Sequence, residues 1–249
     1  MRGIKIWVVL PAYNEADALP LLLDALIEHL EDLSGEFSII VVNDGSKDRT
    51  GEIAEEYARR GHVLPIHNEQ NAGLAETLKR GLIAAVERAD GRDIILTMDA
   101  DNTQPAGLAR RMVRVILEGN DVVIASRYRE GSRVRGVPFA RVLLSYGSSI
   151  LFRTVFPTPG VRDFTSGYRA YRASVLKRLI ERYGNEFISE RGFSCMVDIL
   201  LRLRGLDLVM TEVPLVLRYD QKPGQTKMKV LQTVFDTLRL LVRRRLGAT

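Results

Sequence analysis

Three short polar segments contain the side chains best suited to chemistry, and each directly follows an apolar run. Their sequences are PAYNE at 11–15, NDGSKD at 43–48 and DADN at 99–102. If the apolar runs are parallel strands, these segments meet in the crevice beyond the carboxyl ends of the strands, where open α/β sheets bind ligands. The spacing therefore favours one composite site that contains several carboxylates.

Asp99 and Asp101 could share a divalent cation with a phosphate-bearing substrate. Two carboxylates at positions i and i+2 after a buried strand suit Mg²⁺, which commonly takes one or two carboxylates plus phosphate oxygens and waters. The alternative is that Asp101 or Asn102 only caps the following helix, whose first turn would then contain Pro105. Because an Asp-x-Asp triplet is common by composition alone, both interpretations stay open at this point.

Arginines are concentrated between Arg127 and Arg141, where five arginines accompany a single acid, Glu130. The guanidinium group presents a planar fork of donors that matches phosphate. We interpret Arg127 and Arg141, which flank the segment, as phosphate-binding residues. The other three are expected to be solvated: Arg129, Arg133 and Arg135. A nucleic-acid partner is not favoured, because only Tyr128 could stack on bases within this segment.

The elements that must position these residues follow from the hydrophobic pattern. Short, β-branched apolar runs predict strands buried on both faces of a sheet, at 4–10, 37–42, 63–66, 94–98 and 122–125. One more strand is expected at 208–213, as a candidate to join the same sheet. Helical spacing predicts helices at 19–33, 48–60, 74–89, 107–117, 139–156, 174–182, 195–204 and 230–246. Asp17 is the expected N-cap of the first helix, with Pro20 in its first turn. The alternation of strands and helices indicates a doubly wound α/β sheet.

Composition limits the class of protein. The chain has 249 residues, 46% of them hydrophobic, which is enough for a sizeable core. One cysteine cannot form an internal disulfide, and three histidines without metal-ligand spacing disfavour a histidine zinc site. No apolar run reaches the ~18 residues of a spanning helix. With a net charge of +5, the sequence predicts a cytosolic or membrane-surface protein with an anionic partner.

Taken together and in this order, the three polar segments resemble the motifs of family 2 glycosyltransferases with the GT-A fold. Two later segments, RDFTSGYR at 162–169 and GQTKM at 224–228, are similar to segments of polyprenol- or dolichol-phosphate mannosyltransferases. The resemblance covers essentially the whole chain. It implies a GT-A domain over 1–229, with a doubly wound, mostly parallel sheet flanked by helices, followed by a basic amphipathic helix over 230–249.

The resemblance also implies a donor site. Pro11, Tyr13 and Glu15 would contact the base and ribose, and Asp44 would hydrogen-bond the base. The full set implied to bind the nucleotide sugar is Pro11, Tyr13, Glu15, Val42, Asp44, Asp99, Ala100 and Asp101. Asp101 would ligate Mg²⁺ or Mn²⁺ on the diphosphate. Thr103 and Gln104 stand near the position where some relatives carry a metal-binding glutamine, so they are the candidates for a further ligand.

On the acceptor side, the resemblance implies that Arg127 contacts a phosphate and that Arg141 and Ser145 hold the acceptor phosphate. Lys227 would reach the donor diphosphate as a loop closes. The C-terminal helix carries arginines on one side and could lie on an anionic membrane, although docking on the core is an equal alternative.

The expected reaction is metal-dependent, inverting transfer of a hexose, with mannose the first candidate. The donor would be a GDP- or UDP-linked sugar, and the acceptor a polyprenyl or dolichyl phosphate at the cytoplasmic face of a membrane. One alternative is transfer to a sugar hydroxyl, which needs a carboxylate base such as Asp163 or Glu190. Two further candidates are a sugar nucleotidyltransferase and a non-catalytic docking module.

Overall fold

The computed structural model describes residues 3–33, 36–137, 139–192 and 194–219, with the side chains of all of these except 139–144. Lys227 and the predicted helix at 230–246 lie outside the described residues. Among the residues that are described, no helix combines the length and apolar character needed to cross a membrane.

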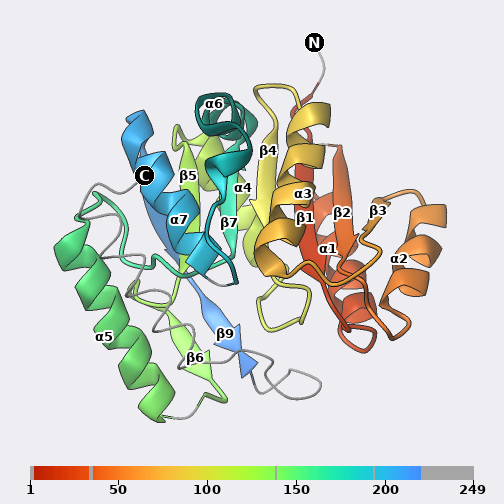
Figure 1. The fold of residues 1–249 in the computed structure, drawn as a ribbon, viewed down its shortest axis with the longest axis horizontal. Coiled ribbons are helices and arrows are strands. Elements are labelled where there is room, and N and C mark those ends of the chain that lie inside the picture. The colour runs from red at the N-terminus through yellow and green to blue at the C-terminus, as the bar shows by residue number, and fades with distance from the viewer. Residues whose placement is uncertain (1–2, 34–35, 138, 193, 220–249) are drawn as a thin grey trace.

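A central seven-stranded sheet runs through the described part of the chain (Figure 1). In spatial order its strands are β3 (Val63–His67), β2 (Phe37–Asn43), β1 (Ile6–Ala12), β4 (Ile94–Thr97), β7 (Arg169–Arg172), β5 (Val122–Ser126) and β8 (Met210–Pro214). β7 runs antiparallel to β4 and β5, whereas the other neighbouring strands pair in parallel. Strands β2, β4 and β5 are buried along their whole length, as continuous apolar runs require.

Helices cover both faces of the sheet (Figure 1). The apolar residues of α1 (Leu19–Glu31), α2 (Thr50–Arg59) and α4 (Leu108–Leu117) form one core cluster. Those of α3 (Leu74–Arg88), α6 (Ala173–Tyr183) and α7 (Ser194–Leu203) form the other. Short 3₁₀ turns follow α6 and α7, η1 (Gly184–Phe187) and η2 (Arg204–Leu206). Two cores separated by one sheet are the arrangement that a doubly wound fold produces.

A smaller unit lies beyond the ends of β5 and β8. Strands β6 (Arg133–Arg135) and β9 (Val216–Arg218) pair in parallel, and helix α5 (Phe139–Val155) lies alongside them (Figure 1). The strands predicted from the apolar pattern do not include β6. The arginines of β6 are exposed, so the apolar signal of a buried strand is missing there.

Most predicted elements agree with the structure to within two residues at each end, including all six predicted strands. The predicted N-cap of α1 is wrong: the cap residue is Ala18, which makes no side-chain cap bond, although Pro20 does stand in the first turn. The amides of Ala18 and Leu19 donate instead to the carbonyl oxygen of Glu15, so the preceding turn satisfies them.

Candidate active site

The first two polar segments are joined to each other by hydrogen bonds. The Asn14 amide donates to Ser46 Oγ at 3.0 Å, and the Lys47 amide donates to Asn14 Oδ1 at 2.8 Å. The Glu15 amide donates to Thr50 Oγ1 at 2.8 Å, at the start of α2. These bonds fix the loops after β1 and β2 as one surface at the carboxyl end of the sheet.

Three of the residues predicted to contact the nucleotide lie on this surface: Pro11, Tyr13 and Glu15. Pro11 and Val42 are register partners at the ends of β1 and β2, and Val42 is buried in the core. Tyr13 and Glu15 are half-buried on the loop that follows. The structure therefore brings the predicted set together, and the individual contacts with a nucleotide stay predictions.

Asp44 organises a third loop. Its Oδ1 accepts hydrogen bonds from Asn68 Nδ2 and from the Ala72 amide, both at 2.8 Å, and its Oδ2 accepts one from the Gly73 amide at 2.9 Å. The residue is only 3% exposed. Asp44 thus shapes the loop 68–73 in front of α3, and its predicted contact with a base would be made from this anchored position.

Asp99 and Asp101 follow β4, and their carboxylates are oriented by the two residues predicted as candidates for a further metal ligand. Gln104 Nε2 donates to Asp99 Oδ2 at 2.8 Å, while Gln104 Oε1 accepts from the Asp99 amide at 3.1 Å. The hydroxyl of Thr103 donates to Asp101 Oδ1 at 2.6 Å, and its amide donates to the same atom at 3.1 Å. Thr103 and Gln104 are buried, and so is Ala100, which lies between the two aspartates in the sequence.

The capping interpretation of Asp101 is wrong. Helix α4 begins at Leu108, and its cap residue is Gly107. Pro105 therefore precedes the helix, and its carbonyl oxygen accepts a hydrogen bond from the Leu108 amide at 3.1 Å. Asp101 lies too far before the first turn of α4 to bind its free amides.

The donor set fits a divalent cation that shares its coordination with a substrate. No cluster of three or more histidine, cysteine, aspartate or glutamate side chains suited to a metal occurs among the described residues. Mg²⁺ binds well to one or two carboxylates when phosphate oxygens and waters complete its shell. Asp99 and Asp101, held by Gln104 and Thr103, provide such a partial site.

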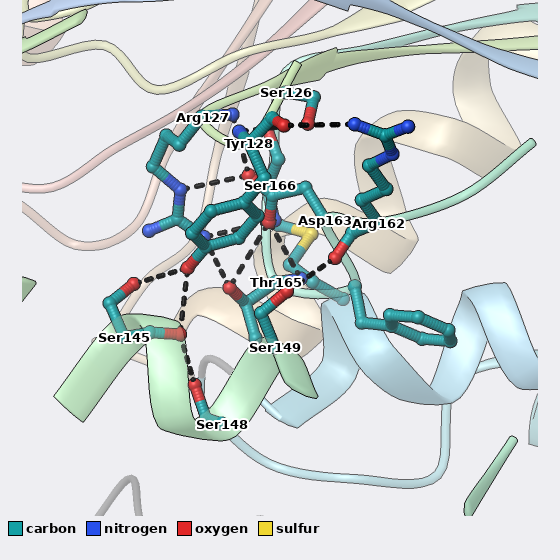
Figure 2. Close-up of polar contacts among 12 residues, drawn as sticks. Ser126, Arg127, Tyr128, Ser145, Ser148, Ser149, Arg162, Asp163, Thr165 and Ser166 are labelled. Atoms are coloured by element: carbon teal, nitrogen blue, oxygen red, sulfur yellow. Dashed lines mark hydrogen bonds and ion pairs between the residues drawn. The ribbon is translucent and has the colours of Figure 1, made fainter. Parts of the chain in front are cut away.

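Arg127 forms a clamp with a fully buried carboxylate (Figure 2). Its Nε donates to Asp163 Oδ2 at 2.9 Å, Nη2 donates to Asp163 Oδ1 at 2.7 Å, and Nη2 also contacts the hydroxyl of Thr165. The Arg127 amide donates to Asp163 Oδ2 at 3.0 Å. Figure 2 shows the remaining terminal nitrogen of Arg127 on the side away from Asp163. The clamp therefore fixes the guanidinium and leaves one terminal nitrogen outside it.

The electrostatics keep this pair ionised. Burial alone would raise the pKa of Asp163, but the charge and hydrogen bonds of Arg127 hold it below its ordinary value. Burial alone would lower the pKa of Arg127, and Asp163 more than compensates by raising it. Since Asp163 is fully buried and both its oxygens accept hydrogen bonds, it is poorly placed to act as the base of a hydroxyl acceptor.

The segment that carries Asp163 also reaches Asp99. The hydroxyl of Thr97 donates to the Gly167 carbonyl oxygen at 2.7 Å. A Cβ atom added to Gly167 would lie 3.4 Å from Asp99 Oδ1, so the backbone passes close to that carboxylate. The acidic pair after β4 and the arginine clamp after β5 therefore adjoin the same segment.

The acceptor residues are only partly described. Arg141 lies in the first turn of α5, and its side chain is outside the description. Ser145 lies one turn further along the helix, and its Oγ is 2.5 Å from the hydroxyl oxygen of Tyr128 (Figure 2). Lys227 lies outside the described residues, so its predicted role is untested.

Sequence reasoning missed β7 and its buried arginine. Arg169 is fully buried, with Nη1 donating to the Met196 carbonyl oxygen at 2.8 Å and Nη2 donating to the Phe164 carbonyl oxygen at 2.9 Å. Arg127 contacts Asp163 and Thr165, which lie in the segment 162–169. Nothing in the sequence spacing indicated a contact between Asp163 and an arginine 36 residues earlier.

Comparison with known proteins places this site in context. The model of the family "Glycosyl transferase family 2" matches residues 7–180. The dolichol-phosphate mannosyltransferase of Pyrococcus furiosus is 32% identical over 241 residues, which are 96% of this chain and 63% of that protein. The polyprenol monophosphomannose synthase of Mycolicibacterium smegmatis is 31% identical over 225 residues, 89% of this chain and 80% of that protein.

The fold is also similar to a solved enzyme structure. Glucosyl-3-phosphoglycerate synthase from Mycobacterium tuberculosis, in complex with Mn²⁺, UDP and phosphoglyceric acid, superposes with a TM-score of 0.69. The match covers 99% of this chain and 80% of that one at 21% sequence identity. This likeness confirms the predicted GT-A architecture.

Proposed function

This chain belongs to glycosyltransferase family 2, and we propose that it transfers a hexose, mannose in first place, from a nucleoside-diphosphate sugar to a polyprenyl or dolichyl phosphate. Relatives named for lipid-phosphate acceptors, at 31–32% identity, support the acceptor class. The observation that carries the proposal is that the Asp99–Asp101 pair and the Arg127 clamp both adjoin the segment 162–169 at the same end of the sheet.

On the donor side, the chain would hold and neutralise a diphosphate leaving group. Asp101, with Asp99 beside it, would bind a Mg²⁺ or Mn²⁺ ion that stabilises the charge on the departing diphosphate. Thr103 and Gln104 hold the two carboxylates in place by the hydrogen bonds described above. The solved structures of similar fold hold Mn²⁺ or Mg²⁺ together with UDP, which supports a divalent ion of this kind.

On the acceptor side, the reaction needs positioning more than proton removal. A phosphate monoester has a second pKa near ~6, so the acceptor is mostly dianionic at neutral pH and is already a nucleophile. Arg127, held rigid by Asp163, would orient phosphate groups near the reacting carbon. Arg141 and Ser145 on α5 would hold the acceptor phosphate opposite the leaving group, which gives inversion.

The remaining parts of the proposal concern the partners and the location. The nucleotide is GDP or UDP, read by the loops that carry Tyr13, Glu15 and Asp44. The enzyme acts as a peripheral protein on the cytoplasmic face of a membrane, with residues 230–249 in contact with the lipid surface. Lys227 would reach the donor diphosphate as a loop closes.

The test is a donor screen with the purified full chain. GDP- and UDP-linked hexoses are incubated with polyprenyl phosphate and Mg²⁺ or Mn²⁺, and lipid-linked sugar is detected by mass. We expect product only when a lipid phosphate and a divalent ion are both present. Product formed without lipid phosphate would favour a hydroxyl acceptor, and release of pyrophosphate from a nucleoside triphosphate would favour a nucleotidyltransferase.

Asp101→Asn keeps the size of the side chain and removes its charge. We expect turnover to fall by more than about a hundredfold, together with loss of metal-dependent nucleotide binding, because a metal ligand is lost. Asp101→Ala should cause the same losses of turnover and of nucleotide binding. Asp32→Asn is the matched control, since Asp32 is an exposed acid paired with Arg110 away from the site. Turnover at the control's level in either Asp101 variant would exclude the metal role.

A further inference from the structure

The side chain of Tyr128 joins the turn after β5 to helix α5 (Figure 2). Its hydroxyl lies 2.8 Å from the Ser145 carbonyl oxygen and 2.5 Å from Ser145 Oγ. The Tyr128 amide donates to Ser126 Oγ at 3.1 Å, which holds the backbone of the turn. Its ring meets the ring of Tyr146 edge-on, with centroids 5.0 Å apart. Tyr128 is therefore fixed at both its backbone and its phenol.

The protons of this contact can be counted. Tyr128 and Ser145 have one hydroxyl proton each. When Tyr128 donates to the Ser145 carbonyl oxygen, the short contact between the hydroxyls must be a bond from Ser145 Oγ to the phenol oxygen. Ser148 Oγ also donates to that carbonyl oxygen, at 2.9 Å. The Tyr128 proton can therefore turn from the carbonyl to Ser145 Oγ while the carbonyl keeps a donor.

We propose that Tyr128 is a positioning residue that makes Ser145 a hydrogen-bond donor to the acceptor phosphate. When a phosphate oxygen comes within reach of Ser145 Oγ, the serine proton turns to the phosphate and the Tyr128 proton turns to Ser145 Oγ. No proton is gained or lost, and each hydroxyl still donates once. The chain of two hydrogen bonds strengthens the donor that faces the anion. The inference rests on the proposed function and adds a residue to its acceptor site.

The surroundings of Tyr128 suit this role. Burial raises the pKa of Tyr128, and the nearby charge of Arg127 offsets this only in part, so the phenol keeps its proton at neutral pH. The guanidinium carbon of Arg127 lies 5.4 Å from the centre of the Tyr128 ring. Because Asp163 clamps Arg127, the same turn sets the position of Arg127 and, through Tyr128, of Ser145. Two phosphate-facing residues on different elements are thus held in one geometry.

The test is Tyr128→Phe, with Tyr146→Phe as the matched control. Tyr146 is the neighbouring tyrosine, half-exposed, and it contacts Tyr128 through its ring. We expect Y128F to raise the KM for polyprenyl phosphate by up to about tenfold, the upper end for the loss of one hydrogen bond between neutral groups. The KM for the donor and kcat should change less than about twofold, because the bond is made equally in the ground state and the transition state. Y146F should match wild type.

A double-mutant cycle separates the relay from a general loss of packing. Ser145→Ala should raise the acceptor KM by itself, and Y128F should add nothing further in the S145A background, because Tyr128 acts only through that hydroxyl. S145A also tests the same bond with the tyrosine intact, should Y128F lose its cooperative thermal transition. Additive effects, an equal rise in donor KM, or a Y128F enzyme equal to Y146F would overturn the inference while wild type still makes lipid-linked sugar. A wild type that makes none would overturn the proposed function itself.

Discussion

At the scale of single residues, two neighbouring buried carboxyl groups have their protonation shifted in opposite directions. Glu212 is 5% exposed, and its Oε1 accepts hydrogen bonds from the amides of Arg162 and Asp163, both at 2.6 Å. Burial raises the pKa of Glu212 above its ordinary value, whereas Arg127 holds that of Asp163 below its own. Folding therefore makes Glu212 harder to ionise and Asp163 easier to ionise.

This shift predicts how Glu212→Gln changes the pH dependence of stability. A group with a raised pKa in the folded state stabilises the fold fully below its unfolded pKa, and that contribution is lost as the pH rises through the folded pKa. The free energy of unfolding of wild type, relative to that of E212Q, should therefore decrease as the pH rises above about 4.3, the ordinary value for glutamate. Urea denaturation of both proteins from pH 4 to pH 8 measures it. A difference that grows with pH would contradict the raised pKa.

At the scale of elements, the loop between α5 and β7 covers the edge strand β8 and carries Asp163. Gly160 in this loop has a φ of +78°, and an added Cβ would lie 2.1 Å from the Met210 carbonyl oxygen. An edge strand covered in this way is protected from pairing with other chains. The close approach of the loop to β8 thus sets the position of the Arg127 clamp.

Gly160→Ala should lower the free energy of unfolding by about 2–4 kcal/mol, because it adds overpacking to the cost of a positive φ. Gly184→Ala is the matched control: its φ is +53°, but nothing lies within 4 Å of an added Cβ. It should cost only about 1 kcal/mol, from the backbone alone. Urea denaturation of the two variants gives both values. Equal losses would show that the loop does not depend on its close contact with β8.

Elements were predictable where the apolar pattern was continuous, and missed where it was not. The interior strands β1, β2, β4 and β5 consist of apolar runs that are stable only where neighbouring strands and both helix layers bury them. β7 has the sequence Arg-Ala-Tyr-Arg. Its first residue, Arg169, can be fully buried because the carbonyl oxygens of Phe164 and Met196 accept hydrogen bonds from its guanidinium. Such tertiary hydrogen bonds leave no trace in a local pattern.

At the scale of the whole molecule, the location of the site could be predicted from the sequence, but the hydrogen bonds that hold its residues could not. The rule that ligands bind beyond the carboxyl ends of strands located Asp44, Asp101 and Arg127 at one end of the sheet. The structure adds what holds each of them: the loop at 68–73, Thr103, and Asp163. These partners are distant in sequence or have ordinary local spacing, so only the packing of the complete fold shows them.

The last prediction concerns how the whole molecule meets a membrane, and it rests on charge. Residues 230–249 carry four arginines and one aspartate in a chain of net charge +5. Replacing Arg243, Arg244 and Arg245 by glutamine should weaken binding to anionic vesicles by about two orders of magnitude, since each basic residue near such a surface contributes about 1 kcal/mol. Sedimentation with phosphatidylcholine vesicles, with and without phosphatidylglycerol, measures the binding. Deleting 230–249 should weaken it at least as much.

A control of equal charge distinguishes a membrane-contacting segment from a generally basic protein. Replacing the exposed Arg129, Arg133 and Arg135 by glutamine lowers the net charge by the same three units at another place on the molecule. If residues 230–249 contact the lipid directly, this control should lose much less affinity than the C-terminal variant, because screening limits the field of a charge to about 8–10 Å at physiological salt. Equal losses in the two variants would mean that overall charge, and not the C-terminal segment, brings the protein to the membrane.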